Sequence, residues 1–188
     1  MKKIIIGISG ASGSIIGVRL LEFLKLDNSF ETHLVVSKWG QQTLEFETKY
    51  NLAMVKKLAS FSYSPGEMGA AISSGSFISE GMIIAPSSMK TIAAIANGFG
   101  NNLIHRAADV VLKEKRKLIL VPRETPLNQI HLENMLRLSK MGVTILPPDP
   151  AFYNKPESID DIVNHIVARI CDQLNIKNDL TKRWDGKM

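Results

Sequence analysis

The sequence predicts one doubly wound α/β domain spanning residues 1–188, with a parallel sheet covered by helices on both faces. At about 150 residues per domain, a chain of 188 residues leaves room for one such domain. Short apolar runs alternate along the chain with helical patterns, which is typical of β–α–β units and a parallel sheet. A glycine-rich turn directly after the first apolar run supports the same fold class.

The elements of the first half follow from this alternation. Residues 3–8 predict a fully buried strand, because the run is short and almost entirely apolar. The turn Ser9-Gly10-Ala11-Ser12-Gly13 leads into an apolar-periodic helix that extends to about Leu26. Residues 33–36 predict a second strand, followed by a helical stretch and a loop rich in Ser and Gly over residues 72–81.

The second half continues in the same way. Strands are predicted at residues 82–85, 118–121 and 143–146, and helices at 89–96, 103–115, 127–141 and 159–174. No repeat, low-complexity tract or linker interrupts them. The chain therefore predicts a Rossmann- or flavodoxin-like sheet of five strands.

Composition excludes several classes of protein. Cys171 is the single cysteine, which rules out a disulfide framework and a cysteine-rich zinc site. No run of about 18 apolar residues is present and the N-terminus is too short for a signal peptide, so we expect a cytoplasmic protein without a membrane span. The net charge of +5 favours anionic partners, but dispersed cations and 6% aromatic residues argue against nucleic acid.

Ligands of doubly wound sheets bind beyond the carboxyl ends of the strands. There the sequence places small hydroxyl, glycine and cationic residues, in the segments 9–13, 37–38, 86–91, 122–126 and 147–153. Several of these segments open helices, whose free N–H groups bind anions. We therefore expect a ligand that carries phosphate.

The glycine turn does not match the common nucleotide motifs. Gly7, Gly10 and Gly13 do not spell G-x-G-x-x-G, and no Gly-Lys-Ser/Thr follows. The second strand ends in Ser37-Lys38 rather than in the acidic residue that NAD binding requires. Two interpretations stay open: a phosphate-binding turn for a mononucleotide, or glycines that allow tight packing of a strand and a helix.

Five motifs occur in order along the chain: Ser9-Gly10-Ala11-Ser12-Gly13, Ser88-Met89-Lys90-Thr91, residues 106–113, residues 122–127, and Pro147-Pro148 with Ala151-Phe152-Tyr153. Together they resemble the UbiX-type flavin prenyltransferases, some of which were earlier named phenylacrylic acid decarboxylases. The resemblance runs from Ile4 to Trp184. It implies an enzyme that transfers a dimethylallyl group from dimethylallyl monophosphate to N5 and C6 of reduced FMN, without a metal.

The resemblance also implies partners. Prenylated FMN would pass to a UbiD-type decarboxylase, in ubiquinone biosynthesis or in phenolic acid detoxification. The family forms large homo-oligomers, typically dodecamers, with sites at subunit interfaces. The sequence leaves open the partner, the subunit number, and whether the donor is a monophosphate or a pyrophosphate.

The resemblance also implies the site residues, carried over one by one to the matching positions of this sequence. The FMN contacts are Gly10, Ala11, Ser12, Ser37, Ser88, Met89, Lys90, Thr91 and Arg123. The prenyl phosphate contacts are Lys113, Tyr153 and Arg169, and the catalytic set is Ser12, Glu47, Arg106, Lys113 and Glu124. Many relatives have Cys where this chain has Ser87, which removes any argument for thiol chemistry.

Residue patterns allow a second interpretation of these side chains. Arg106 and Lys113 lie seven residues apart, on one edge of a predicted helix. They could form a phosphate clamp, or they could belong to a solvated helix face with an Asp109–Lys113 ion pair. Arg169 borders the apolar stripe of the last helix. It could be a surface arginine, or its guanidinium could bind a phosphate together with Tyr153.

The turn after the fourth strand predicts a helix start, and the histidines predict no metal site or triad. Thr125 is the predicted N-cap of the next helix, with Pro126 at its first position, beside the charged pair Arg123 and Glu124. The four histidines match no metal spacing and no triad.

The expected chemistry is departure of an allylic phosphate. Lys and Arg would stabilise the leaving group, and the flavin with Trp184 or Tyr153 would stabilise positive charge on the prenyl group. Two alternatives stay open: an FMN-dependent cysteine decarboxylase and a non-catalytic FMN carrier. Against the first, the chain has no histidine before His33 and no Pro-x-Met-Asn motif; against the second, it contains candidate prenyl-phosphate cations.

Overall fold

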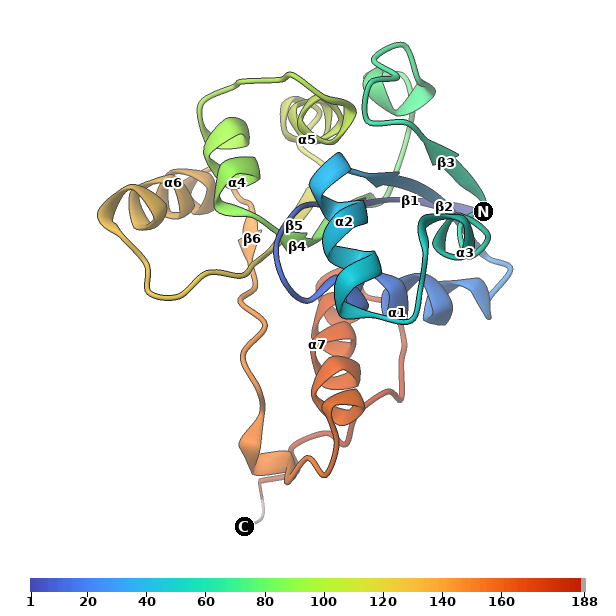
Figure 1. Ribbon diagram of the computed structural model, residues 1–188, viewed down its shortest axis with the longest axis vertical. Coiled ribbons are helices and arrows are strands. Elements are labelled where there is room, and N and C mark those ends of the chain that lie inside the picture. The colour runs from blue at the N-terminus through green and yellow to red at the C-terminus, as the bar shows by residue number, and fades with distance from the viewer. Residues whose placement is uncertain (187–188) are drawn as a thin grey trace.

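Six parallel strands form one sheet in the order β3-β2-β1-β4-β5-β6, in a computed structural model that describes residues 1–186 (Figure 1). The strands are β1 (Lys2–Ile8), β2 (Phe30–Val36), β3 (Phe61–Tyr63), β4 (Gly81–Ser87), β5 (Lys117–Pro122) and β6 (Thr144–Ile145). The chain runs outward from β1 to β3 on one side and from β4 to β6 on the other. The predicted doubly wound fold is confirmed, and its switch point lies between β1 and β4.

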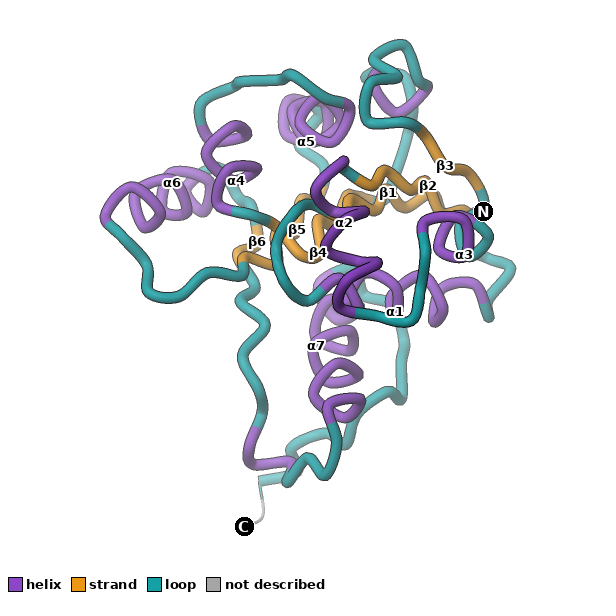
Figure 2. Tube along the Cα trace, in the orientation of Figure 1, coloured by secondary structure: helices purple, strands orange, loops and turns teal. Residues whose placement is uncertain are grey.

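Helices cover both faces of this sheet (Figure 2). They are α1 (Ser14–Lys25), α2 (Lys38–Glu47), α3 (Leu52–Lys56), α4 (Met89–Ala96), α5 (Leu103–Lys113), α6 (Gln129–Lys140) and α7 (Ile159–Gln173), with short 3-10 turns η1 (Ala71–Ser73) and η2 (Phe152–Asn154). Alternate residues of β1 face opposite layers: Ile4 and Ile6 pack with α1 and α7, whereas Ile5 packs with α4 and α5. The central strands are buried on both sides, as expected for a parallel sheet.

Two local predictions differ from the structure. The edge strand β3 was not predicted, because only three residues pair with β2 and two of them are exposed. The helix predicted from Leu127 begins at Gln129, so Thr125 is not its N-cap and Pro126 is not its first residue. Asn128 is the cap instead: its side chain accepts from the His131 N–H, and the His131 ring accepts from the Asn128 N–H.

The C-terminal tail, residues 174–186, folds back beside α7 (Figure 1). Arg183 donates two hydrogen bonds to Asp172, at 2.6 and 2.7 Å, and the Ile176 side chain is buried in the core. Cys171 is fully buried in the same core, where burial raises the pKa of its thiol to about 12. Within residues 1–186 we find no helix that combines the length and the apolar character needed to cross a bilayer.

Candidate functional site

The first turn, residues 9–13, is bonded directly to the turn after β4. The Ser9 hydroxyl donates to the Pro86 carbonyl at 3.0 Å and accepts from the Ser88 N–H at 2.8 Å. Ser88 then caps α4, because its side chain accepts from the Thr91 N–H at 3.3 Å. Ser9 therefore holds the two predicted flavin-binding turns side by side at the switch point of the sheet.

The start of α2 closes the other side of the first turn. A Cβ atom added to Gly10 would lie 2.5 Å from the Trp39 Cβ atom, a distance that real Cβ contacts do not reach. Ser37 caps α2 by accepting from the Gly40 N–H at 2.9 Å. Gly10 thus allows the backbones of two helix-opening turns to approach, which answers the question that the glycine pattern left open: the turn does serve close packing.

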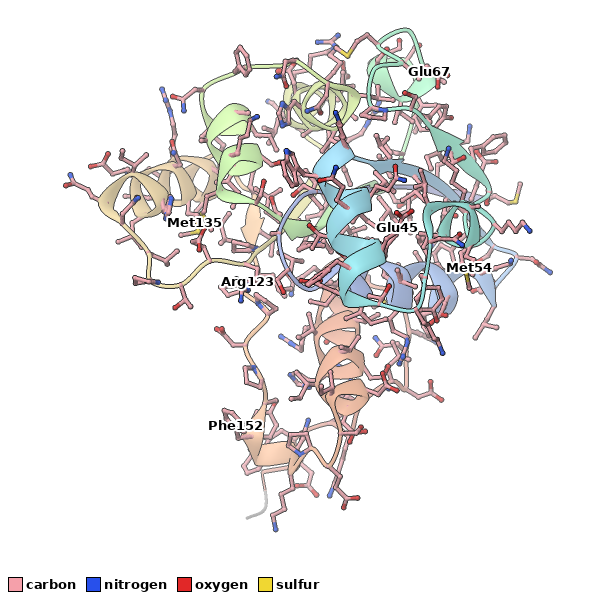
Figure 3. All side chains as sticks on the ribbon, in the orientation of Figure 1. Glu45, Met54, Glu67, Arg123, Met135 and Phe152 are labelled. Carbon is pink, nitrogen blue, oxygen red and sulfur yellow. The ribbon has the colours of Figure 1, made fainter. Side chains whose placement is uncertain are left out.

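The predicted FMN contacts follow the carboxyl ends of four strands and so lie along one edge of the sheet, the edge where the strands end. They follow β1 (Gly10, Ala11, Ser12), β2 (Ser37), β4 (Ser88, Met89, Lys90, Thr91) and β5 (Arg123, labelled in Figure 3). The Arg123 N–H donates to the Ser87 carbonyl at 3.3 Å, which joins the last two of these ends. The structure therefore gathers this predicted set within one chain.

Two observations at this edge fit a phosphorylated flavin. The N-termini of α1, α2 and α4 all open here, and helix N-termini favour anions. The Ser87 hydroxyl is fully buried at the end of β4 and has no hydrogen-bond partner among the described residues. Gly10, Lys90, Arg123 and Glu124 are nevertheless exposed, so one chain leaves this edge open to solvent.

Glu47 reaches the first turn from the last position of α2. Its carboxylate accepts from the Gly13 N–H at 2.9 Å and from the Ser14 N–H at 3.4 Å. Gly13 has a φ of +97°, a left-handed conformation that favours glycine, and it is the N-cap residue of α1. A carboxylate is favourable at a helix N-terminus, so Glu47 is held at the predicted site.

Arg106 and Lys113 occupy opposite ends of α5. Arg106 donates to Asp109 at 2.8 Å and to the Ser73 carbonyl at 3.2 Å. Lys113 pairs with Glu114 rather than forming the suggested Asp109–Lys113 pair. Lys113 also lies four residues before the start of β5, at the edge where the strands begin, and hence away from the flavin contacts of its own chain.

Tyr153 and Arg169 lie apart from these cations. Tyr153 is in η2, beyond the end of β6, beside Phe152, which Figure 3 places near the lower end of the molecule, well below Arg123. Arg169 on α7 donates to Asp172 at 2.7 Å, and the described structure shows no Arg169–Tyr153 fork. A single chain therefore does not join Lys113, Tyr153 and Arg169 into one cluster.

The histidines are buried to different degrees and are spread over the fold. Burial lowers the pKa of His33, His105 and His165, and in His105 the nearby Lys90 lowers it further. His33 lies between Glu31 and Tyr63, at 2.8 and 2.9 Å, near the edge of the sheet. In the part of the chain that the structure describes, no three His, Cys, Asp or Glu side chains are grouped to hold a metal.

Two residues that shape the site were not predicted from the sequence. Ser9 was quoted only as part of a motif, although its hydroxyl links the two turns. Trp39 was not considered, although it is 69% exposed and its backbone lies against Gly10. The available signal was a tryptophan two residues after Ser37, close to a strand end where ligands were expected.

Comparisons with known proteins agree with this geometry. The Flavoprotein family model matches residues 1–171. Flavin prenyltransferase LpdB of Lactiplantibacillus plantarum is 55% identical over 186 residues, covering 99% of this chain and all of that protein. A dodecameric FMN-dependent UbiX-like decarboxylase from Escherichia coli O157:H7 superposes with a TM-score of 0.97 at 55% identity, covering 98% of this chain and 100% of that one.

A third similar structure carries ligands. AnUbiX (PadA1), solved in complex with FMN and dimethylallyl pyrophosphate, has a TM-score of 0.97 and 45% identity, covering 100% of this chain and 99% of that one. The turns at the strand ends, the parallel sheet and the similarity over almost the whole chain all indicate the same family. The chain belongs to the UbiX-like flavin prenyltransferases of the Flavoprotein family.

Proposed function

We propose that this protein is a flavin prenyltransferase that transfers a dimethylallyl group from dimethylallyl monophosphate to N5 and C6 of reduced FMN. One observation carries the proposal: Ser9 bonds the first turn to the Ser88 cap, so two helix-opening turns form a single anion-binding edge. When bound there, the reduced flavin supplies the nucleophilic ring atoms.

The residues of this edge hold and orient the acceptor. Gly10, Ala11, Ser12, Ser37, Ser88, Met89, Lys90, Thr91 and Arg123 are the proposed FMN contacts. Backbone N–H groups and the Arg123 guanidinium suit an anionic phosphate and a polar ring edge. Glu47 and Glu124 are proposed to act beside them in catalysis, with Ser12.

The donor is bound by cations that stabilise the leaving phosphate. Lys113, Arg169 and the Tyr153 hydroxyl are the proposed phosphate contacts, and Arg106 is proposed as a further catalytic residue. Positive charge at the phosphate favours breaking of the allylic C–O bond, because negative charge accumulates on the oxygen that leaves. The rings of Tyr153 and Trp184 suit the positive charge that develops on the prenyl carbon.

Assembly completes this donor site. Lys113, Tyr153 and Arg169 lie in three separate parts of one chain, so we propose that neighbouring subunits bring them together. The exposed flavin edge and exposed aromatic residues such as Phe46 and Phe152 support a homo-oligomer, and we propose a dodecamer. We further propose a cytoplasmic protein that delivers its product to a UbiD-type decarboxylase.

The decisive experiment uses the purified protein with reduced FMN and dimethylallyl monophosphate. Mass spectrometry of the extracted flavin should show FMN carrying one added prenyl group, and omission of the donor should abolish that species. Recovery of unmodified FMN alone would overturn the proposed function. A parallel reaction with dimethylallyl pyrophosphate decides which donor the protein prefers.

The same protein separates this activity from decarboxylation. We expect no carbon dioxide from a cinnamic acid when the protein holds only ordinary FMN and no partner is added. Release of carbon dioxide under those conditions would show that the protein decarboxylates the acid directly.

A further inference from the structure

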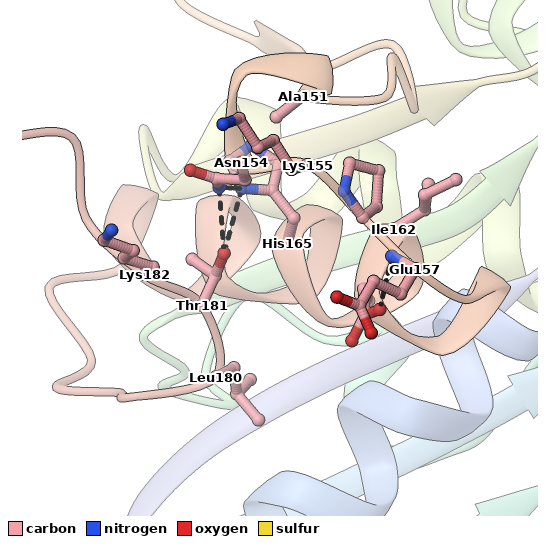
Figure 4. A pocket seen from close by; sticks show the side chains of 11 residues that line it. Ala151, Asn154, Lys155, Glu157, Ile162, His165, Leu180, Thr181 and Lys182 are labelled. Atoms are coloured by element: carbon pink, nitrogen blue, oxygen red, sulfur yellow. Dashed lines mark hydrogen bonds between the residues drawn. The ribbon is translucent and has the colours of Figure 1, made fainter. Parts of the chain in front are cut away.

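A hydrogen-bonded group around His165 joins three segments of the chain (Figure 4). The Asn154 side-chain N–H₂ of η2 donates to His165 Nδ1 on α7 at 3.3 Å and to the Thr181 hydroxyl at 3.2 Å. The Thr181 oxygen, in the C-terminal tail, lies 3.3 Å from the same His165 nitrogen. η2, α7 and the tail therefore meet at one imidazole.

Two aromatic rings lie beside this group. The Tyr153 ring packs edge-on against His165, with centroids 6.0 Å apart, and edge-on against Trp184, with centroids 5.6 Å apart. Tyr153 is 56% exposed and Trp184 is 53% exposed, so each presents ring surface to solvent. The two rings come from η2 and from the tail, the two segments that the His165 group connects.

Packing alone does not hold these segments. η2 has no buried residue, and a cavity of about 320 Å³ lies between its end, α7 and the tail (Figure 4). Asn154, His165 and Thr181 all line that cavity. Their hydrogen bonds therefore link Tyr153 in η2 to the tail, which the Arg183–Asp172 pair and the buried Ile176 side chain also hold beside α7.

We propose that His165 is a positioning residue for prenyl-donor binding: its neutral imidazole holds Tyr153 and Trp184 in one arrangement by joining η2 to the tail. The inference rests on the proposed function, which places Tyr153 at the prenyl phosphate. His165 itself need not touch the donor.

The protonation state of His165 is part of this arrangement. Asn154 Nδ2 carries only donor hydrogens, so His165 Nδ1 accepts from it and must be unprotonated. The charged and titratable groups around the ring are Asp149, Tyr153, Lys155 and Glu157 near η2, Asp161, Arg169 and Asp172 on α7, and Lys182 and Arg183 in the tail. Burial and the two arginines lower the pKa of His165, which keeps the ring neutral near pH 7.

The test compares His165→Leu with His165→Asn. Leucine cannot accept a hydrogen bond, whereas the asparagine oxygen replaces the Nδ1 acceptor. We expect His165→Leu to raise the KM for dimethylallyl monophosphate about tenfold, as for loss of a net hydrogen bond or two, with unchanged FMN affinity and little change in kcat. His165→Asn should restore the wild-type KM. In acid the KM of the wild type should rise more than that of His165→Asn, because protonation of the donor phosphate affects both proteins alike.

A fluorescence measurement tests the positioning without the reaction. In a Trp39→Phe background Trp184 is the single tryptophan, and acrylamide should quench its emission more strongly in His165→Leu than in His165→Asn. Thr181→Val, which removes the hydroxyl from the tail side, should increase quenching in the same way.

The outcomes distinguish the two proposals. Unchanged quenching and unchanged donor KM in His165→Leu would overturn the positioning role. If the wild type forms no prenylated flavin, the proposed function fails, and the quenching series still decides whether His165 orders Trp184. Equal loss of FMN affinity and kcat in both His165 variants would indicate general unfolding, and this result would also overturn the positioning role of His165.

Discussion

The Glu47 carboxylate lies 2.9 Å from the Gly13 backbone nitrogen, so the last residue of α2 caps the first turn of α1. The two helices follow adjacent strands and pack together. This hydrogen bond fixes the corner that contains Gly10 and Ser12. A proposed catalytic carboxylate is thereby held by the backbone of the turn beside which it acts.

Replacing Glu47 tests this cap. Glu47→Ala should reduce the free energy of unfolding by about 0.5–2 kcal/mol, the usual cost of losing an N-terminal cap. Glu47→Gln keeps an acceptor oxygen, so its free energy of unfolding should decrease less. Urea unfolding measures the difference, and equal stability of all three proteins would contradict the capping role. A catalytic role of Glu47 predicts that prenylation falls in Glu47→Gln even where stability is retained.

Gly10→Ala should weaken FMN binding. The added methyl would lie 2.5 Å from the Trp39 Cβ atom, so either α2 or the first turn must move. We expect a loss of about 1–3 kcal/mol in stability from this overpacking and a drop of at least about tenfold in FMN affinity, measured by flavin fluorescence titration.

Gly69→Ala is the matched control for that substitution. A Cβ atom there meets nothing within 4 Å, so FMN affinity should be unchanged. If Gly10→Ala binds FMN as well as Gly69→Ala does, the flavin site does not use this turn.

Lys113→Ala and Arg169→Ala should separate donor use from flavin binding. Each charge-assisted contact is worth about 1.5–3 kcal/mol, so prenylation should fall by about 10- to 150-fold. FMN affinity should persist, because the flavin contacts lie at other strand ends. The surface pairs with Glu114 and Asp172 contribute little, so stability should change by less than about 1 kcal/mol.

Lys140→Ala, in the last turn of α6, provides the charge-matched control and should keep full prenylation. Loss of FMN in both Lys113→Ala and Arg169→Ala would show that flavin and donor share one set of contacts. Full prenylation in both would leave these cations as a solvated basic surface.

Mild acid should destabilise the protein through its buried histidines. The pKa values of His33, His105 and His165 are lowered from 6.5 in the folded chain, so the unfolded chain binds more protons between 6.5 and the lowered values. Stability is therefore complete above pH 6.5 and falls as the pH drops through that window. The midpoint of thermal unfolding should decrease accordingly at constant ionic strength.

His105→Leu tests the origin of that loss. His105 Nδ1 is buried without a hydrogen-bond partner among the described residues, so an apolar side chain should be tolerated there. The variant should lose less stability between pH 7 and acid than the wild type does. An identical pH dependence would assign the acid sensitivity to other groups.

The sequence predicts the elements that have a strong apolar pattern. Strand β1 was found near its observed ends because its short run is almost entirely apolar, and helix α7 because its apolar residues recur with the helical period. Strand β3 escaped because its pairing partner is distant in the chain and its own three residues carry no burial pattern. Asn128 escaped because the Thr125-Pro126 pair resembles a helix start more closely than it does.

The site was predictable to the extent that it is local. Ser37 and Ser88 follow strands and precede helices, so their positions follow from the element order. The Ser9–Ser88 bond and the Gly10–Trp39 approach depend on packing across the sheet, which no local pattern encodes. Lys113, Tyr153 and Arg169 lie in separate parts of the described chain, so their proposed joint role depends on the subunit assembly that we propose.

The burial of Cys171 makes the protein well suited to site-directed labelling. A thiol with no exposed surface and a pKa of about 12 is almost entirely un-ionised at neutral pH, and the thiolate is the form that maleimides attack. A second cysteine placed at an exposed position such as Lys140 would therefore take up a fluorophore alone. Energy transfer between subunits labelled in this way would follow assembly while the native Cys171 is kept.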